Sequence, residues 1–309
     1  MTSMPGRVFQ TVPGYKNHLY QELETANPKG SVLEDWGPLL YTDSTANSVF
    51  WHQNIWLNPV KIEFDSINEA ASALREMGRN WAPVLFTQYR RGSLIKSKLP
   101  PLPEKDRPFP WLLPETPMGA FTLLDAHTMI ASSLCSSPFP GGIIKFSEDK
   151  NGPPSRAYLK LWEALVLSRK WPLAGENCLD AGASPGGWTW ALAKLGANVT
   201  AVDRSPLDPK ISCLENVRYI KHDAFTLQPE DTGRLHWLFC DVICYPPRLY
   251  EWVQKWLSSG LCDNFICTIK MQGEADHKTT GLFAEIAGSR VIHLGYNKHE
   301  LTWIKLTKN

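Results

Sequence analysis

N-C-L-D-A-G-A-S-P-G-G-W, residues 177–188, is a short apolar run that ends near an acid and continues into a glycine-rich loop. Glycine lets a backbone turn tightly and come close to a ligand, and a helix that begins after such a loop offers free N–H groups. Residues 187–195, which follow, have helical character. The stretch therefore predicts a strand, a ligand-binding loop and a helix, as found at the carboxyl ends of strands in open α/β sheets.

Strand and helix signals continue to alternate toward the carboxyl end of the chain. Strand-like runs occupy residues 198–203, 217–221, 235–241 and 264–270, and helical patterns occupy 247–257 and 275–287. This alternation predicts a doubly wound α/β sheet covered on both faces. The last two runs, 290–295 and 300–306, have no helix between them, so we expect an antiparallel pair. We expect the final strand to insert beside the strand that ends at Lys270.

The amino-terminal part has a different pattern. Residues 7–12 and 15–24 form one strand–helix unit, and residues 60–64 and 68–77 form another. Two such units favour a small α+β domain of ferredoxin-like type. Residues 136–154 are rich in Pro, Gly and Ser and are typical of a linker. We therefore predict two domains, an α+β domain at 1–140 that can bind RNA and a Rossmann-like domain at 141–309.

Composition limits the classes of function. The chain has 309 residues and a net charge of +1, so any nucleic-acid contact must come from local patches. The seven cysteines are odd in number and lie mostly in apolar runs, which favours reduced thiols. No cysteine or histidine spacing is typical of a metal site, so we predict none. No signal peptide or apolar stretch of about 20 residues is visible, which predicts a soluble cytoplasmic protein without membrane contact.

Acidic residues lie at or just after the ends of the predicted strands that follow the glycine loop. Asp203 ends the second strand about 20 residues further on, where an acid can accept the hydroxyls of an adenosine ribose. Asp223 follows the third strand and can accept from an adenine amino group, and Asp241 closes the fourth. The loop lacks the dinucleotide spacing G-x-G-x-x-G, because Ser184 and Pro185 occupy its middle. An ordinary Rossmann turn with helix-capping acids and an NAD site remain the alternatives.

Four further charged residues lie in or beside apolar segments, where burial of a charge costs free energy. Asp241 and Lys270 end apolar runs, and Glu300 begins another. Lys160 lies in the helical segment that enters the domain. Charged groups in such places are expensive unless they are paired or used. Neighbouring strands lie roughly 5 Å apart, so we expect the four to share one cleft. The alternative is a buried ion network without chemistry.

Several motifs together resemble one known family. They are P-S-R-A-Y-L-K-L-W-E-A at 154–164, D-A-G-A-S-P-G-G-W-T at 180–189, F-C-D at 239–241 and I-K-M at 269–271. They are similar to the FtsJ-like RNA ribose 2′-O-methyltransferases, above all to members that modify large-subunit ribosomal RNA. The resemblance covers residues 136–309 well and residues 1–135 loosely.

The resemblance implies S-adenosylmethionine as cofactor and a Lys-Asp-Lys-Glu tetrad, which matches Lys160, Asp241, Lys270 and Glu300. The family often has Ser where this chain has Ala157, so one side-chain contact to the cofactor would be absent. The residues expected to bind the cofactor are Gly182, Ser184, Pro185, Gly186, Gly187, Trp188, Asp203, Asp223 and Asp241.

A ribose hydroxyl is a poor nucleophile until its proton is removed. Lysine can act as general base when burial and a neighbouring cation lower its pKa. The hypothesis is that Lys270 takes the proton. Lys160 helps to lower the pKa of Lys270 and steadies the alkoxide, while Asp241 and Glu300 orient the two lysines.

The segment 88–98, Q-Y-R-R-G-S-L-I-K-S-K, is basic and contains an aromatic residue. Arg90, Arg91, Lys96 and Lys98 can pair with phosphates, and aromatic rings can stack on unpaired bases. A solvated loop without function is the alternative. The substrate is expected to be ribosomal RNA, with tRNA, a messenger cap or a non-catalytic RNA-binding role as alternatives. The oligomeric state stays open.

Overall fold

A computed structural model describes residues 1–26, 32–43, 49–102 and 106–307. The chain divides into two compact units. The first contains residues 1–107 and 113–145, and the second contains residues 108–112 and 146–309. The assignment of separate functional domains to 1–140 and 141–309 stays a prediction.

The second unit holds the predicted alternation of strands and helices. Its elements are α4 (Tyr158–Ser168), β10 (Asn177–Ala181), α5 (Gly187–Lys194), β11 (Asn198–Asp203), α6 (Pro209–Ser212), β12 (Val217–Lys221), a 3-10 turn (Ala224–Thr226), α7 (Pro229–Thr232), β13 (Leu235–Cys240), α8 (Pro246–Ser259), β14 (Cys262–Lys270), α9 (His277–Glu285), β15 (Ser289–Ile292) and β16 (Glu300–Lys305).

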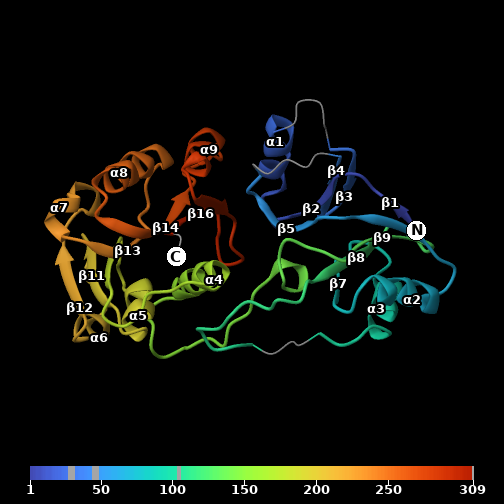
Figure 1. Cartoon of the computed structure of the whole chain (residues 1–309), viewed down its shortest axis with the longest axis horizontal. Coiled ribbons are helices and arrows are strands. Elements are labelled where there is room, and N and C mark those ends of the chain that lie inside the picture. Colours follow the sequence, from blue (N-terminus) through green and yellow to red (C-terminus); the bar gives the residue numbers. More distant parts are fainter. Residues whose placement is uncertain (27–31, 44–48, 103–105, 308–309) are drawn as a thin grey trace. The chain divides into compact units, whose positions relative to one another are not determined.

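These strands form one seven-stranded sheet in the order β12-β11-β10-β13-β14-β16-β15. Strands β10 to β14 pair in parallel, whereas β16 runs antiparallel to both β14 and β15. Helices α8 and α9 lie on one face of the sheet, and α4 and α5 lie on the other (Figure 1). The doubly wound sheet and the insertion of its last strand beside β14 are therefore confirmed.

Helix α8 shows how the sequence covers the sheet. Its buried residues Leu249, Trp252, Val253 and Trp256 follow the helical period and form one apolar face. Two prolines occupy the first turn, where their missing N–H groups cost nothing. The helix ends at Gly260, whose φ of 66° suits glycine.

The first unit is built on two sheets. Its elements are β1 (Thr2–Ser3), β2 (Arg7–Thr11), α1 (Lys16–Ala26), β3 (Glu34–Trp36), β4 (Leu39–Thr42), β5 (His52–Trp56), β6 (Val60–Glu63), α2 (Ile67–Met77), β7 (Trp81–Pro83), α3 (Tyr89–Ser97), β8 (Gly119–Leu123), β9 (Thr128–Ser132) and a 3-10 turn (Pro140–Gly142).

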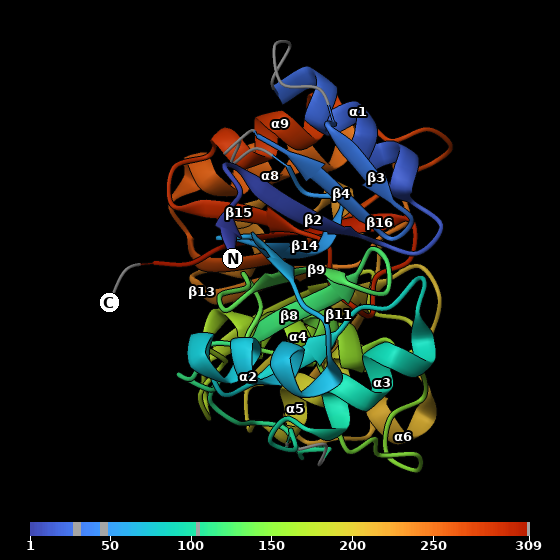
Figure 2. The same cartoon turned by 90° about the vertical axis from the view of Figure 1, so that its right-hand side faces the viewer.

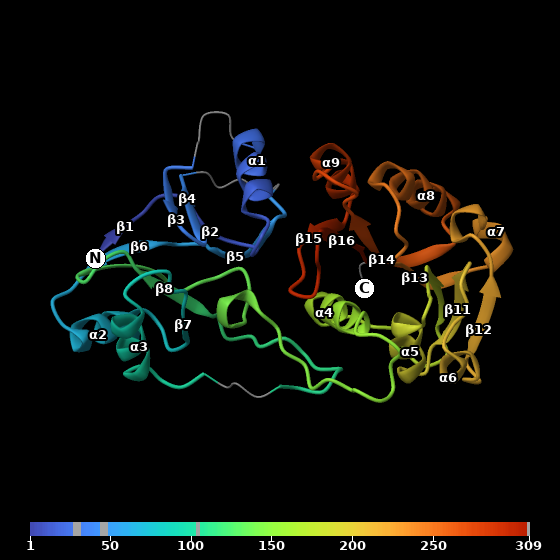
Figure 3. The same ribbon diagram turned by 180° about the vertical axis from the view of Figure 1, so that it is seen from behind.

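One sheet has the order β1-β6-β9-β8-β7 and the other the order β3-β4-β2-β5. Helices α2 and α3 lie side by side against the first of these sheets (Figure 2), and α1 lies beside the second (Figure 3). The mixed α+β character is confirmed, but the ferredoxin-like arrangement is wrong. The two strand–helix units fall in different sheets, because β6 pairs with β9 of the 119–132 hairpin and β2 pairs with β4 and β5.

None of the helices that the structure describes combines the length and the apolar character needed to cross a membrane.

Candidate active site

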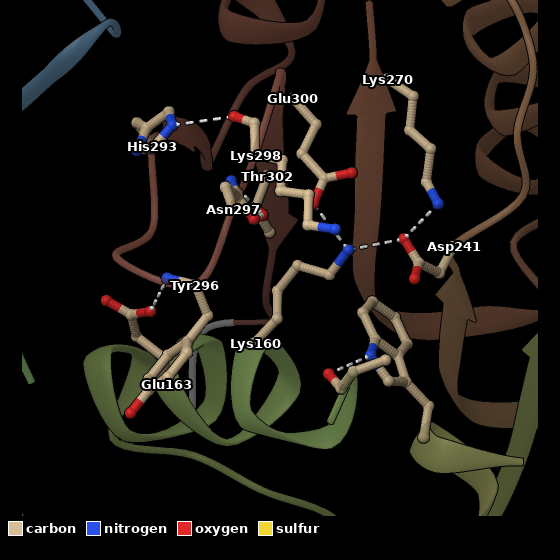
Figure 4. Close-up of polar contacts among 12 residues, drawn as sticks. Lys160, Glu163, Asp241, Lys270, His293, Tyr296, Asn297, Lys298, Glu300 and Thr302 are labelled. Carbon is tan, nitrogen blue, oxygen red and sulfur yellow. Dashed lines mark hydrogen bonds and ion pairs between the residues drawn. The ribbon is translucent and has the colours of Figure 1, made fainter. Parts of the chain in front are cut away.

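Four side chains from four different elements meet at the carboxyl end of the parallel strands (Figure 4). The Nζ of Lys160 lies 2.8 Å from Oδ1 of Asp241 and 2.9 Å from Oε1 of Glu300. The Nζ of Lys270 lies 3.1 Å from the same Oδ1 of Asp241. The structure thus brings together all four residues singled out from the sequence, and their catalytic roles stay predictions.

Strand register explains this convergence. Lys270 ends β14 and Glu300 begins the antiparallel β16, so the two residues face each other across the ladder. Asp241 follows β13, the neighbour of β14 on its other side, and its N–H donates to the carbonyl of Ala181 in β10. Lys160 reaches the group from α4, and its Nζ lies 5.6 Å from the centre of the Trp188 ring.

The charges of this cluster are strongly coupled. Burial would lower the pKa of Lys160, but the carboxylates of Asp241 and Glu300 outweigh it and raise that pKa above its usual value. Burial likewise favours the neutral form of Asp241, yet Lys160 and Lys270 lower its pKa. Lys160 therefore stays an ammonium ion between two carboxylates, whereas Lys270 forms one ion pair among the described residues, with Asp241.

A pocket adjoins this cluster. Its lining residues are Ser155, Ala157, Gly182, Ala183, Ser184, Pro185, Gly187, Trp188 and Asp241.

The backbone of the glycine loop is closely packed around the pocket. Gly182 has a φ of +81°, and a Cβ at this position would lie 2.6 Å from Cγ2 of Val242. A Cβ at Gly187 would lie 2.5 Å from Oγ of Ser155. These two positions require glycine because any side chain would collide with neighbouring atoms.

Ser155 was not singled out from the sequence. Its hydroxyl is buried and has no hydrogen-bond partner among the described residues. Ala157, two residues later, lines the same pocket without a polar side chain. A buried hydroxyl without a partner costs free energy, so a bound ligand that contacts Ser155 would remove this cost. The only signal in the sequence was its place in the P-S-R segment.

Comparison with known proteins identifies the second unit. A family model described as FtsJ-like methyltransferase matches residues 153–294. The second unit is therefore similar to FtsJ-like methyltransferases over this range, and it is called the FtsJ-like domain below. This range includes the glycine loop and three members of the charged cluster, and Glu300 lies beyond it.

Several curated relatives have the name Ribosomal RNA large subunit methyltransferase M. The protein of Azoarcus sp. is 33% identical over 165 residues, which cover 52% of this chain and 44% of that protein. The protein of Alkalilimnicola ehrlichii is 34% identical over 53% of this chain and 49% of its own length. The protein of Aromatoleum aromaticum is 40% identical over 38% of this chain and 33% of its own length. The chain thus spans less than half the length of these relatives.

Among solved structures, a magnesium protoporphyrin IX methyltransferase from Synechocystis with bound SAM is 16% identical, with a TM-score of 0.35 over 48% of this chain and 78% of that chain. A likeness at this level supports no conclusion about activity.

Two acids expected to bind the cofactor hold neighbouring parts of the FtsJ-like domain. Asp203 accepts N–H groups of Ser184 at 3.0 Å and of Ser205 at 2.8 Å. Asp223 forms ion pairs with Arg204 and Arg248. Both acids follow strands as expected, but neither lines the pocket beside Asp241. Their roles in cofactor binding stay predictions.

Glu163 is a second residue that sequence reasoning missed. It lies on α4, three residues after Lys160, and is fully buried. Its two carboxylate oxygens accept the N–H groups of Gly295 at 2.9 Å and Tyr296 at 3.1 Å. These residues belong to the turn between β15 and β16 that leads to Glu300 (Figure 4). An acid in the otherwise apolar stretch Y-L-K-L-W-E-A was its only signal in the sequence.

The same turn contains further buried polar contacts. The ring Nε2 of His293 lies 3.2 Å from the carbonyl oxygen of Lys298, and burial lowers the pKa of His293 to about 4. His293 is therefore neutral near pH 7 and donates this hydrogen bond. The side-chain amide of Asn297 donates to Oγ1 of Thr302 at 3.1 Å. The turn is thus fixed at several points.

The predicted RNA-contacting cations lie in the first unit, on helix α3 and just after it. Residues 89–97 form a helix rather than a loop, and their contact with RNA stays a prediction, as does the alternative of a solvated segment without function. The guanidinium of Arg91 lies 5.3 Å from the centre of the Phe64 ring and donates to a backbone carbonyl. Lys96 donates to the carbonyl of Trp81. Arg90 and Lys98 are exposed, which leaves them as the better candidates for phosphate contacts.

Proposed function

We propose that the FtsJ-like domain binds S-adenosylmethionine and transfers its methyl group to a ribose 2′-hydroxyl of RNA, with large-subunit ribosomal RNA as the substrate. The observation that carries the proposal is the meeting of Lys160 and Lys270 on Asp241 beside the pocket of the glycine loop. The names of the curated relatives support ribosomal RNA as the substrate. A cytoplasmic location is part of the same proposal.

The pocket fits the cofactor. When bound, S-adenosylmethionine supplies a methyl group on a positively charged sulfur, which a nucleophile can attack. The glycine loop lets the backbone approach a ligand, and the unpartnered hydroxyl of Ser155 offers it a hydrogen bond. Residues 182–188, Ser155 and Asp241 would hold the molecule. Asp203 and Asp223 would contact its adenosine part, as the acids after these strands are placed to do.

In this proposal, the four charged residues have different roles in the activation of the ribose hydroxyl. The amine of Lys270 would accept the proton of the hydroxyl. The hydroxyl oxygen would form its bond to the methyl carbon as the carbon–sulfur bond breaks and leaves a neutral thioether. Lys160 stays charged between two carboxylates and stabilises the negative charge that develops on this oxygen. Asp241 contacts both lysines and fixes their geometry. Much of the rate enhancement then comes from positioning the two reactants.

The proposal is tested by transfer of a labelled methyl group to protein-free ribosomal RNA, followed by mapping of 2′-O-methylated positions. We expect Lys270→Ala to lower the transfer rate at least 100-fold and to leave the dissociation constant of S-adenosylmethionine within about twofold, because the lysine acts on the hydroxyl. Lys305→Ala, at the other end of β16, is the matched control and should transfer normally. Retention of a tenth of the rate in Lys270→Ala would contradict the role of this lysine.

Other outcomes decide between the alternatives. Transfer to tRNA or to a messenger cap, with none to ribosomal RNA, would keep the chemistry and change the substrate. Binding of both cofactor and RNA without transfer to any RNA would favour a non-catalytic role.

A further inference from the structure

Directly after Asp241, the chain exposes two large apolar side chains. Residues 242–245, here called the ledge, connect β13 to α8 in an irregular segment. Ile243 is 75% exposed and Tyr245 is 67% exposed, whereas Cys244 between them is buried. Ile243 and Tyr245 therefore both face solvent, and the buried Cys244 anchors the ledge between them.

The ledge is held at both ends. At its beginning, Val242 packs so closely on the glycine loop that no Cβ fits at Gly182. At its end, the carbonyl of Tyr245 accepts the N–H groups of Arg248 and Leu249 in the first turn of α8. Two prolines in that turn restrict the backbone further. An exposed apolar pair on a fixed segment offers a preorganised surface, so little conformational freedom is lost when a partner binds.

Two cations lie near the ledge, Arg248 paired with Asp223 and Lys270 paired with Asp241. Arg248 follows it on α8, and its side chain is 55% exposed. Burial raises the pKa of Cys244 to about 11, and the charges of Arg248 and Lys270 act in the opposite direction. Arg248 lies in the first turn of α8 directly after the ledge, and Lys270 contacts Asp241 directly before it. Apolar side chains bordered by cations match a ligand that carries both flat rings and phosphates.

We propose that the ledge is a stacking surface for an unpaired base of the substrate RNA, next to the ribose that is methylated. The inference rests on the proposed function, because that function places the reacting hydroxyl at Lys270. The nucleotide that carries this hydroxyl, or its neighbour, then crosses the adjacent ledge. The exposed ring of Tyr245 stacks on the base, Ile243 packs beside it, and the partly exposed guanidinium of Arg248 pairs with a phosphate. A single-stranded or looped RNA is the class of substrate that can present a base in this way.

The test compares Tyr245→Ala, Tyr245→Phe and a control variant in methyl transfer to protein-free ribosomal RNA. We expect Tyr245→Ala to raise the KM for RNA about 10-fold, because stacking on an aromatic ring stabilises a bound base. The rate at saturating RNA and the affinity for S-adenosylmethionine should stay within about twofold. Tyr245→Phe should retain the wild-type KM because the ring remains. Leu173→Ala is the control, since Leu173 is 63% exposed in the same unit, before the amino end of β10.

A second measurement separates this inference from the proposed function. Binding of a fluorescent single-stranded oligoribonucleotide is measured without cofactor, and Tyr245→Ala should weaken it about 10-fold relative to Leu173→Ala. If the wild type methylates RNA but Tyr245→Ala leaves both KM and oligonucleotide affinity unchanged, the inference fails and the function stands. A loss seen only on assembled ribosomal particles would indicate a protein partner and would also overturn it. If no RNA is methylated but the oligonucleotide affinity still falls, the function fails and the stacking surface remains.

Discussion

Glu163 is a carboxyl group whose pKa burial has raised from 4.5 to about 7. Its hydrogen bonds from two backbone N–H groups lower the pKa and offset only part of the effect of burial. The folded chain therefore retains a proton on Glu163 that the unfolded chain releases between about pH 4.5 and pH 7. Its contribution to the free energy of unfolding is greatest below this window and is lost as pH rises through it.

Replacement of Glu163 by Gln removes this titration. We expect the unfolding free energy of the wild type, measured relative to Glu163→Gln, to fall by about 3 kcal/mol between pH 4.5 and pH 7.5. Asp180, whose pKa burial also raises to about 7, titrates in both proteins and cancels in the comparison. Denaturant unfolding of both proteins at a series of pH values provides the measurement. Parallel curves would show that Glu163 has an ordinary pKa in the folded chain.

Individual site residues could be predicted from the sequence where an apolar strand ended in a charged residue. Asp241 and Lys270 stood out because nothing in their local pattern required a charge there. Glu163 and Ser155 did not stand out. The position of Glu163 within one helical segment does not show that its carboxylate meets a turn more than a hundred residues away. Ser155 is significant only because its hydroxyl lacks a partner in the folded chain.

At the level of elements, one helix serves two purposes. Helix α4 carries Lys160 into the charged cluster, and one turn later it carries Glu163, which holds the turn leading to Glu300. The distance between Lys160 and Glu300 therefore depends on both contacts of Glu163. A misplacement of about 1 Å at a catalytic group can lower a rate 100-fold.

We expect Glu163→Gln to lower the rate of methyl transfer about 10-fold. Glutamine retains one acceptor oxygen and places an NH₂ group against the second backbone N–H, which loosens the turn. The KM for RNA and the affinity for S-adenosylmethionine should change less than twofold. Hydrogen exchange at the amides of Gly295 and Tyr296 should become faster, while exchange within β14 stays unchanged. Faster exchange with an unchanged rate would show that the turn does not position Glu300.

The pairing of elements was predictable only in the second unit. There the alternation of strands and helices restricts the possible orders of a parallel sheet, and the missing helix before β16 indicated its direction. In the first unit the strands and helices themselves were visible, but their partners were not. Strand β6 pairs with β9 across a long intervening segment, and local patterns do not specify such a pairing.

For the whole molecule, a net charge of +1 means that the proposed RNA binding depends on local groups of cations. Arg90 and Lys98 form one such group in the first unit, since Arg91 and Lys96 make contacts within that unit. No sequence pattern distinguished the two exposed cations from the two that contribute to packing.

Reversal of both charges, Arg90→Glu with Lys98→Glu, should weaken RNA binding and make it less sensitive to salt. Two lost phosphate contacts correspond to a change of about 1.4 in the slope of log affinity against log salt for a single strand. Arg218→Glu with Lys221→Glu, exposed on β12, changes the net charge equally and serves as control. Binding isotherms at several salt concentrations give the slope. Equal slopes for the two double variants would exclude α3 as a phosphate-binding helix.

At one edge of the sheet, the order of the strands makes the attachment of β15 depend on β16. Strand β15 precedes β16 in the chain but touches the sheet only through it. A premature stop codon after Asn297 would therefore detach two strands rather than one, and would leave the ammonium of Lys160 with a single counterion. A chain that stops there would keep its glycine loop but leave β14 as an open sheet edge, a form suited to aggregation or degradation rather than to catalysis.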